Sequence, residues 1–463
     1  MAAPENILIL GFGINNAPLL PYWVARGARV TVADRNESVV DPAATAVRWT
    51  VGPSYVEQAQ ACGPYDRIYL TPGIPPHHPD VQRLAAGAVL TCETDLFLAL
   101  CPAPVLGITG SAGKTTTTTL LGAMLAEDGR RPVHVGGNIG RSLFAIVEAI
   151  QPGDWVAMEL SSFQLQLVTK SPAGAAVLNL SPNHLDHHRE MGEYAAAKAR
   201  IFQFQSPDDF LVTDAVPPPL MAAALARHRG QRVTVSLTAP VEQGAYLEGG
   251  TMMWRPEPGR AALPIQTLDR WRLPGRMNVH NALVAMSLAL RAGARPEAVA
   301  AALAAFRGVP HRLELVAEQG GIRYINDSIA TAPDRTLAAL DALGNASGGG
   351  RPRPLVLVAG GYDKHLDYGP LGRALAERAR MVALTGPTGP DIARAISAAV
   401  APGSGPRLLG PLPFDDAVQA ALEAAEPGDI VLLSPASASY DAFRNFEERG
   451  QRFRTLVACH LGP

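Results

Sequence analysis

Residues 104–119 read PVLGITGSAGKTTTTT, and this stretch decides the fold of the chain around it. Its apolar start, Val105–Ile108, predicts a buried strand, and Gly110–Gly113 predicts a tight turn before Lys114 and Thr115 open a helix. The amides of such a turn and the first N–H groups of the helix point at one spot, where the helix dipole also favours an anion. The stretch therefore predicts a cradle for phosphate groups.

In this cradle, Lys114 is expected to reach the terminal phosphates of a nucleotide, and the Thr115 hydroxyl to ligate a magnesium ion. The pattern G-x-x-x-x-G-K-[ST] is not met in full, because Ile108 stands where its first glycine belongs. A glycine-rich turn without a ligand is the alternative. The position of Gly-Lys-Thr between a strand and a helix favours the phosphate site.

Length and composition limit the class of protein. With 463 residues, 47% of them hydrophobic, the chain is long enough for about three domains with sizeable cores. A net charge of -2 gives no reason to expect nucleic acid or a membrane surface as a partner. The four scattered cysteines lack metal-type spacing and are expected to be reduced thiols of a cytoplasmic protein. No signal peptide is apparent and no apolar run reaches ~18 residues, so membrane insertion is not expected.

The N-terminal part predicts a Rossmann-like unit. A strand at 6–10 ends in Gly-Phe-Gly, and a strand at 29–33 ends in Asp34-Arg35, which is the order of elements in a nucleotide-binding fold. The third glycine of that fingerprint is missing, so a tight turn without a ligand is the alternative. A strand at 67–70 leads into the loop 71–75, and loops at the carboxyl ends of parallel strands line the ligand crevice. We expect a nucleotide to bind there.

A second α/β unit begins with the phosphate cradle. Residues 155–160 predict a buried strand that carries one acid, Glu159. A carboxylate in such a run is costly unless it is paired or bound to metal. After a phosphate loop, Glu159 is expected to be a second ligand of the magnesium held by Thr115, and a salt bridge within the core is the alternative. Residues 136–140, GGNIG, predict a turn.

The loop 181–188 holds three histidines after a predicted strand at 175–180. Without cysteines or a helical H-x-x-x-H spacing, it is a poor zinc motif. His184, nearest the strand, is expected to face the phosphates, whereas His187 and His188 are expected at the surface. A helix follows at 191–204, and Lys198 on it would by itself be an ordinary surface lysine.

Residues 232–271 alternate in polarity between turn residues, which predicts antiparallel strands at the edge of this unit. Asn278 precedes an alanine-rich helix and could be its N-cap. A third α/β unit follows, with ligand loops expected at one end of a sheet whose strands lie at 323–325, 354–358, 381–384 and 429–433.

Two residues of this third unit allow two interpretations each. Lys364 is either a ligand or a solvated loop lysine. Ser439 is either a ligand or the N-cap of a helix that contains Phe443 and Phe446.

Further motifs lie along the chain in a fixed order: TGSAGKT, GGNIG, ELSSFQL, NHLDHH, YAAAKARIF, LPGRMNVHNAL, GVPHRLE, INDSIAT, GGYDKHLDY and SPASASYDAFRNFEERG. Together they resemble the Mur ligases of peptidoglycan synthesis, over essentially the whole chain. Within that family the resemblance is to the branch that adds D-glutamate to UDP-N-acetylmuramoyl-L-alanine.

The resemblance implies an α/β fold of three domains. Residues 1–93 would form a Rossmann-like domain for the UDP substrate. Residues 94–309 would form a P-loop ATPase-type central domain with an attached antiparallel β segment. Residues 310–463 would form a Rossmann-like domain for glutamate. The implied protein is a cytoplasmic, monomeric, ADP-forming ligase that joins glutamate to UDP-N-acetylmuramoyl-L-alanine through an acyl phosphate, with domain closure assembling the site.

The resemblance also implies the site residues. The catalytic residues would be Lys114, Glu159, His184 and Lys198. ATP would be bound by Gly110, Gly113, Lys114, Thr115, Thr116, Asn281, Arg312 and Asp327. The UDP substrate would be bound by Gly13, Ile14, Asn15, Asp34, Arg35, Gly73 and Asn138, and glutamate by Thr331, Lys364, Ser439, Tyr440 and Phe446.

Two magnesium ions are implied by the same resemblance. Their protein ligands would be Thr115, Glu159, His184 and Lys198. Lys198 would be carbamylated by carbon dioxide, which turns a cation into an anionic oxygen ligand. An unmodified ammonium would be repelled by a metal ion at that position.

The chain departs from the family pattern at three positions. Ile329 stands where a lysine is usual, Ala112 replaces the usual asparagine of the phosphate loop, and Asn183 replaces an acid beside His184. The loss of a cation at Ile329 leaves D- and L-glutamate open as substrates. We expect catalysis to survive all three changes.

Other functions are ranked lower. A folate polyglutamylating ligase would share the phosphate loop but not the GGNIG and NFEERG motifs. A nucleotide-driven switch ATPase would rest on the phosphate loop alone. A dinucleotide oxidoreductase would rest only on Gly11-Phe12-Gly13 and Asp34.

Overall fold

The computed structural model describes residues 4–140, 142–181, 188–273, 275–345, 354–364, 366–401 and 404–462. It confirms the predicted mixed α/β class, with three sheets. The chain divides into two compact units. Unit 1 consists of Met1–Arg272 and Arg276–Phe306, and unit 2 of Leu273–Gly275 and Arg307–Pro463. Among the described helices, none is both long and apolar enough to cross a bilayer.

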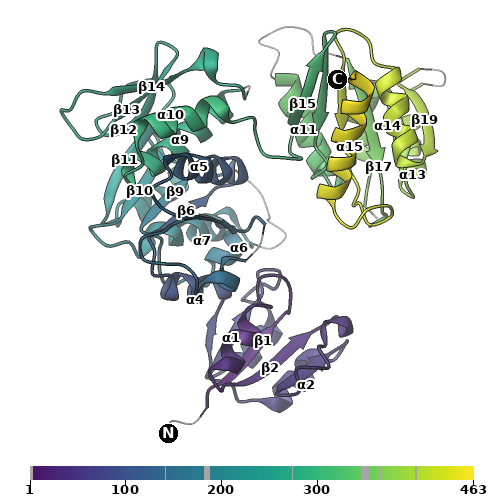
Figure 1. Ribbon diagram of the computed structural model, residues 1–463. Helices are drawn as coiled ribbons and strands as arrows, with labels where there is room; N and C mark the ends of the chain where they lie inside the picture. Colours follow the sequence, from purple (N-terminus) through teal and green to yellow (C-terminus); the bar gives the residue numbers. More distant parts are fainter. Residues whose placement is uncertain are drawn as a thin grey trace. The chain divides into compact units, whose positions relative to one another are not determined.

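Unit 1 begins with a parallel sheet in the order β3-β2-β1-β4-β5, purple in Figure 1. Side chains of β1 alternate between its faces: Ile7 and Ile9 pack with Leu19 of α1, and Leu8 and Leu10 pack on the side of α2 and α3. The elements are β1 (Asn6–Leu10), α1 (Leu19–Ala25), β2 (Arg29–Asp34), η1 (Glu37–Val39), β3 (Val47–Val51), α2 (Tyr55–Cys62), β4 (Arg67–Leu70), α3 (Pro79–Leu84), β5 (Val89–Thr91) and α4 (Glu93–Leu100).

The second sheet of unit 1 has the order β14-β13-β12-β11-β10-β9-β6-β8-β7. The helix that follows the phosphate loop, α5, packs against α9 and α10, while α6 packs against α7. The elements up to α7 are β6 (Val105–Thr109), α5 (Lys114–Asp128), β7 (Val133–Gly137), η2 (Leu143–Ile146), β8 (Trp155–Glu159), α6 (Ser162–Leu165), β9 (Gly174–Val177) and α7 (Met191–Gln203). The rest are β10 (Phe210–Asp214), η3 (Pro219–Met221), α8 (Ala222–Leu225), β11 (Gln231–Ser236), β12 (Gly244–Glu248), β13 (Thr251–Arg255), β14 (Leu263–Thr267), η4 (Leu268–Arg270), α9 (Arg276–Arg291) and α10 (Pro296–Ala305).

The edge of this sheet corrects one prediction. β12, β13 and β14 are antiparallel as expected, but β11 runs parallel to both β10 and β12. The chain crosses over from β10 to β11 through η3 and α8, so both strands point the same way. Alternating polarity shows which side chains share a face, but it does not show strand direction.

Unit 2 has a sheet in the order β15-β16-β20-β17-β18-β19, in which only the β15–β16 pair is antiparallel. One apolar core lies under α12 and α13, and the other under α14 and α15. Figure 1 shows α15, in yellow, running along the sheet beside α14. The elements are β15 (Glu314–Gln319), β16 (Ile322–Asn326), α11 (Pro333–Asn345), β17 (Leu355–Gly360), α12 (Gly369–Arg378), β18 (Ala379–Thr385), α13 (Gly389–Ser397), β19 (Arg407–Leu412), α14 (Phe414–Glu423), β20 (Ile430–Leu433) and α15 (Phe446–Leu461).

Two helix starts differ from the predicted alternatives. α15 begins at Phe446 with Asn445 as its N-cap, whose side chain accepts a backbone N–H of the first turn. Phe443 therefore lies before the helix, and Ser439 is not its cap. Asn278 is the third residue of α9 rather than the residue before it, so it is not an N-cap either.

Candidate active site

The phosphate loop has the predicted strand–turn–helix form. β6 ends at Thr109 and α5 begins at Lys114. Gly113 caps the helix with a left-handed φ of 84°, and a β-carbon there would lie 2.4 Å from Asn281 Oδ1. Only glycine fits this position. Asn281, on α9, is 1% exposed, so the structure brings it directly behind the loop.

Polar contacts from the segment after β9 clamp the loop. Asn179 Oδ1 accepts the Ala112 N–H at 2.9 Å, and Asn179 Nδ2 donates to Ala112 O at 3.0 Å. Ser111 Oγ donates to Ser181 O at 3.0 Å and lies 3.0 Å from the Tyr194 hydroxyl. The sequence did not predict these roles, because Asn179 and Tyr194 stand in no pattern that points to the loop. The clamp holds the turn in a defined shape.

Two lysines converge on the loop. Lys114 Nζ and Lys198 Nζ each donate to Gly110 O at 2.9 Å, and Lys198 also donates to Thr109 Oγ1 at 3.3 Å. Lys198 is 1% exposed and lies over the Tyr194 ring, so it is not a surface lysine. Burial, helped by the charge of Lys114, lowers the pKa of Lys198 to about 7, against the opposing effect of Glu159.

Glu159 ends β8 beside the same loop and is 2% exposed. Its Oε1 accepts Asn138 Nδ2 at 2.9 Å, and its backbone oxygen accepts the Asn138 N–H at 2.9 Å. Gly137 makes this contact possible, because a β-carbon there would lie 2.3 Å from Glu159 O. Glu159 Oε2 is buried without a hydrogen-bond partner among the described residues. Such an oxygen fits a divalent cation, which would supply the missing partner.

The rest of the predicted metal set is only partly within the described residues. Thr115 is the second residue of α5, next to Lys114. His184 and His187 lie outside the described residues. Within the described part of the chain there is no group of three His, Cys, Asp or Glu side chains placed to hold a metal ion. The ligand set therefore stays a prediction.

His188 corrects the prediction of a surface histidine. It is 0% exposed, its Nε2 lies 2.9 Å from Ser162 Oγ, and its ring stacks on Phe163. Its ring edge also meets Tyr194 at a centroid distance of 5.2 Å. A loop rich in histidine suggested solvent, but the apolar faces of α6 and α7 bury this one and satisfy its nitrogen with a hydroxyl.

The residues predicted for the UDP substrate lie at the carboxyl ends of β1, β2 and β4, apart from Asn138. They are Gly13, Ile14, Asn15, Asp34, Arg35 and Gly73. Asp34 joins two of these ends, since it accepts the Phe12 N–H at 2.6 Å and the Asn36 N–H at 2.7 Å. A cavity of about 220 Å³ opens beside Gly73, with Tyr55 in its wall.

In unit 2, Arg312 lies between two residues with left-handed backbone, His311 (φ 63°) and Leu313 (φ 43°). Such conformations cost of order 1–3 kcal/mol each and persist where surrounding contacts fix them. The Leu313 N–H donates to Asp327 Oδ1 at 3.1 Å, and Ser434 Oγ donates to its Oδ2 at 2.8 Å. Burial raises the pKa of Asp327 to about 6, and the Arg312 charge opposes this rise.

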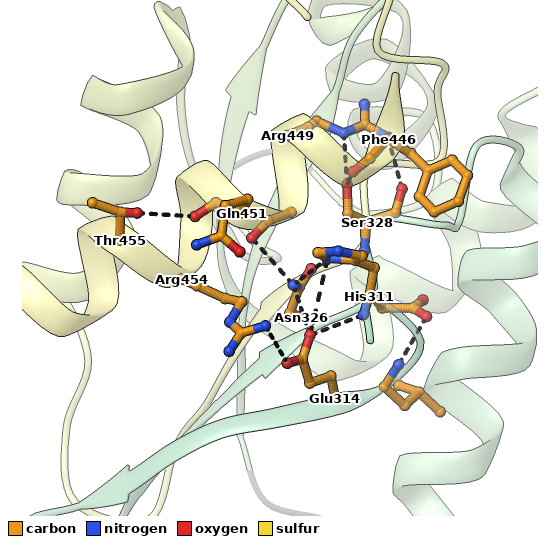
Figure 2. A network of polar contacts seen from close by, with 12 residues as sticks. His311, Glu314, Asn326, Ser328, Phe446, Arg449, Gln451, Arg454 and Thr455 are labelled. Carbon is orange, nitrogen blue, oxygen red and sulfur yellow. Dashed lines mark hydrogen bonds and ion pairs between the residues drawn. The ribbon is translucent and has the colours of Figure 1, made fainter. Parts of the chain in front are cut away.

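Figure 2 shows the polar network behind this turn. Asn326 Nδ2 donates to Glu314 Oε2 at 3.1 Å, and the His311 N–H donates to the same oxygen at 2.8 Å. Arg449 of α15 is 2% exposed, and it donates to Ser328 O and Oγ and to the carbonyl oxygens of residues 437 and 438. One arginine thus ties the loop after β16 to the loop after β20.

The residues predicted for glutamate lie at this end of the sheet of unit 2. Thr331 follows β16, Lys364 follows β17, Ser439 and Tyr440 follow β20, and Phe446 begins α15. Ser439 is 2% exposed, whereas Tyr440 is 65% exposed and meets the Tyr362 ring edge to face. These positions are compatible with one binding site formed by all five residues, and the role of each residue in binding glutamate stays a prediction.

Comparison with known proteins matches this architecture. The Mur ligase middle domain matches residues 108–289, and the Mur ligase glutamate ligase domain matches residues 311–437. The UDP-N-acetylmuramoylalanine–D-glutamate ligase of Symbiobacterium thermophilum is 44% identical over 98% of each chain, and that of Acetivibrio thermocellus is 37% identical over 98% of this chain and 96% of its own.

Solved structures show the same fold at lower identity. The UDP-N-acetylmuramate–alanine ligase of Thermotoga maritima matches with a TM-score of 0.55 at 18% identity, covering 98% of this chain and 99% of its own. A MurF ligase of Thermotoga maritima in complex with ADP matches with a TM-score of 0.53 at 16% identity, covering 98% and 96%.

Proposed function

The chain belongs to the Mur ligase family, and from this premise we propose that it is the ATP-dependent ligase that joins D-glutamate to UDP-N-acetylmuramoyl-L-alanine in peptidoglycan precursor synthesis. Relatives that span nearly its whole length carry this activity in their names, at 35–44% identity. Their names specify D-glutamate, which favours it over L-glutamate despite Ile329. The match of unit 2 to the Mur ligase glutamate ligase domain favours a ligase over an ATPase that acts as a switch.

The charged side chains around the phosphate loop support the proposal independently of the family. Lys114, Lys198 and the buried oxygen of Glu159 gather around a single glycine-rich turn at the start of α5. Two lysine amines and an unsatisfied carboxylate oxygen in one buried place are costly without a ligand. A triphosphate with its magnesium supplies the charges that this place lacks.

The reaction we propose has two chemical steps. ATP phosphorylates the L-alanyl carboxylate, which forms an acyl phosphate and releases ADP. The amine of D-glutamate then attacks the acyl carbon, and the collapse of the tetrahedral adduct expels phosphate and leaves an amide. Lys114 and the loop amides would neutralise charge on the transferred phosphoryl group, and Arg312 would contribute from its own loop.

Magnesium fits the residues present, and we propose two ions. Thr115 and Glu159 would hold one, and His184 and a carbamylated Lys198 would hold the other. Bound magnesium would draw charge off the phosphate oxygens and hold the reacting groups in line. The lowered pKa of Lys198 supports carbamylation, because only the neutral amine reacts with carbon dioxide.

We also propose that each domain binds one of the three substrates. A Rossmann-like domain at 1–93 would bind the UDP substrate, the P-loop domain at 94–309 would bind ATP, and a Rossmann-like domain at 310–463 would bind glutamate. The separate sheets of these regions support it. We propose that the enzyme works as a monomer in the cytoplasm, where its three substrates are small molecules and nucleic acid is not a partner.

The test is product formation from purified protein. With ATP, magnesium and UDP-N-acetylmuramoyl-L-alanine, mass spectrometry should show the glutamyl product with D-glutamate, and at least about a hundredfold less with L-glutamate, the difference expected for a buried polar group left unpaired. Equal use of both enantiomers would refute the assigned stereochemistry. ATP hydrolysis without any amide product would refute the ligase itself.

A further inference from the structure

A buried acid stands at the start of the helix that joins the two sheets of unit 1. Glu93 is the first residue of α4, directly after β5 and Cys92, and it is 5% exposed. Its Oε1 accepts Ser142 Oγ at 2.5 Å, and its Oε2 accepts Thr94 Oγ1 at 3.2 Å. Burial raises the pKa of Glu93 to about 7. A carboxyl group in such a place costs stability, and the proposed chemistry makes no use of it.

The partner of Glu93 lies at the end of the GGNIG loop, residues 136–140. Ser142 is two residues beyond this loop and is 6% exposed. Its Oγ accepts the Phe144 N–H at 3.2 Å and so caps η2. The bond from Ser142 to Glu93 therefore fixes the point at which the loop enters the next element.

The middle of the loop is fixed at Glu159. Asn138 holds this residue through one backbone and one side-chain hydrogen bond. Gly140, the last residue of the loop, has a left-handed φ of 64°. Glycines give the loop little stiffness of its own, so its shape depends on the contacts that hold Asn138 and Ser142.

We propose that Glu93 is a positioning residue for the ligase reaction: its hydrogen bond with Ser142 anchors the GGNIG loop so that Asn138 keeps Glu159 oriented toward the phosphate loop. Since only Cys92 separates Glu93 from β5 of the first sheet, the same bond couples that sheet to the site. This inference rests on the proposed function, because it concerns the orientation of the residue assigned to magnesium.

The first turn of α4 also offers a matched control. Asp95 Oδ1 accepts the Thr169 N–H at 2.6 Å and the Thr169 hydroxyl at 3.0 Å. Its Oδ2 accepts the Thr91 hydroxyl of β5 at 3.1 Å. Asp95 therefore ties the same helix to β5 and to the segment between α6 and β9, but it leads to neither the GGNIG loop nor Glu159. Both carboxylate oxygens of Asp95 accept hydrogen bonds, and Asp95→Asn leaves only one acceptor. It therefore weakens the attachment of α4 without touching the proposed chain of contacts.

The experiment compares turnover, magnesium dependence and melting temperature for Glu93→Ala, Ser142→Ala, the double variant, Glu93→Gln and Asp95→Asn. Glu93→Ala and Ser142→Ala should each lower kcat about tenfold, the effect of one buried hydrogen bond, and raise the magnesium concentration for half-maximal rate. The double variant should lose no more than either single variant. The KM for glutamate should not change, and Glu93→Gln, which can still accept from Ser142, should restore kcat to within about threefold.

Asp95→Asn should lower the melting temperature but keep kcat. The inference is overturned if Glu93→Ala keeps the kcat of the unmodified enzyme. It is also overturned if Glu93→Ala and Asp95→Asn lower kcat equally at an equal drop in melting temperature, or if the effects of Glu93→Ala and Ser142→Ala on kcat add in the double variant. Turnover of the unmodified enzyme separates this result from the proposed function, since a wild-type protein that forms no amide refutes the function and not the anchoring.

Discussion

Lys198→Ala is the substitution that bears most directly on the proposed carbamate. An amine with the ordinary pKa of 10.5 is about 0.1% neutral at pH 7.5, whereas a pKa of about 7 leaves about three-quarters of it neutral. Burial thus raises the fraction able to react with carbon dioxide several hundredfold. Because the neutral form is lost as the pH falls through 7, it drops from about nine-tenths at pH 8 to about one-tenth at pH 6.

The assay follows the carbamate and turnover together. The chain has only four lysines, Lys114, Lys170, Lys198 and Lys364, so carbon-13 NMR with labelled bicarbonate should give one resolved carbamate signal. The signal should weaken by at least about tenfold between pH 8 and pH 6 at a fixed concentration of dissolved carbon dioxide, because the neutral amine is lost and carbamate formation releases a proton. It should disappear in Lys198→Ala. That variant should lose at least about a thousandfold in turnover and recover partly with added acetate or formate.

Lys170→Ala is the control, because Lys170 is exposed and lies between α6 and β9 rather than on α7 with Lys198. It should keep both the NMR signal and turnover. Full unaided activity of Lys198→Ala would refute the carbamate role. A signal that survives in Lys198→Ala would assign the modification to another lysine.

Three further predictions concern separate parts of the molecule. Asp128→Asn should destabilise unit 1 by about 2 kcal/mol in urea unfolding at pH 7. Burial raises the pKa of this aspartate, but its hydrogen-bonded ion pairs with Arg130 and Arg295 outweigh burial and lower the pKa to about 2. The stability is present above pH ~4 and is lost as the pH falls through 2, and equal stability of the variant at pH 7 would contradict the assignment. Glu159→Gln should raise the magnesium concentration for half-maximal turnover at least about tenfold, since a neutral oxygen binds the cation less well, and an unchanged magnesium titration would remove Glu159 from the metal site. Ile329→Lys should change the KM for glutamate by about threefold or more while leaving the KM for ATP as it is, and no change would place position 329 outside the amino-acid site.

Local patterns were enough to predict the form of the phosphate loop and the strand beside it. The turn at Gly110–Gly113 and the helix from Lys114 follow from the order of strand, glycines, lysine and threonine. The buried strand with Glu159 at its end follows from one acid in an apolar run. These features are determined by neighbours in sequence, so the sequence alone contains the information.

Features that depend on distant contacts could not be predicted in this way. The Asn179 clamp on Ala112 spans 67 residues, and nothing near Asn179 points to the loop. His188 was misjudged because its burial comes from the packing of α6 and α7 around it. The direction of β11 was missed because polarity alternates equally in parallel and antiparallel strands.

The central claim is that ATP activates the carboxyl group of the UDP substrate by phosphorylation. The direct measurement labels both oxygens of the L-alanyl carboxylate with oxygen-18 and follows the label by mass spectrometry through one turnover with D-glutamate. Transfer through an acyl phosphate predicts one labelled oxygen in the released phosphate and one in the new amide. Phosphate that carries no label would contradict this account of the reaction.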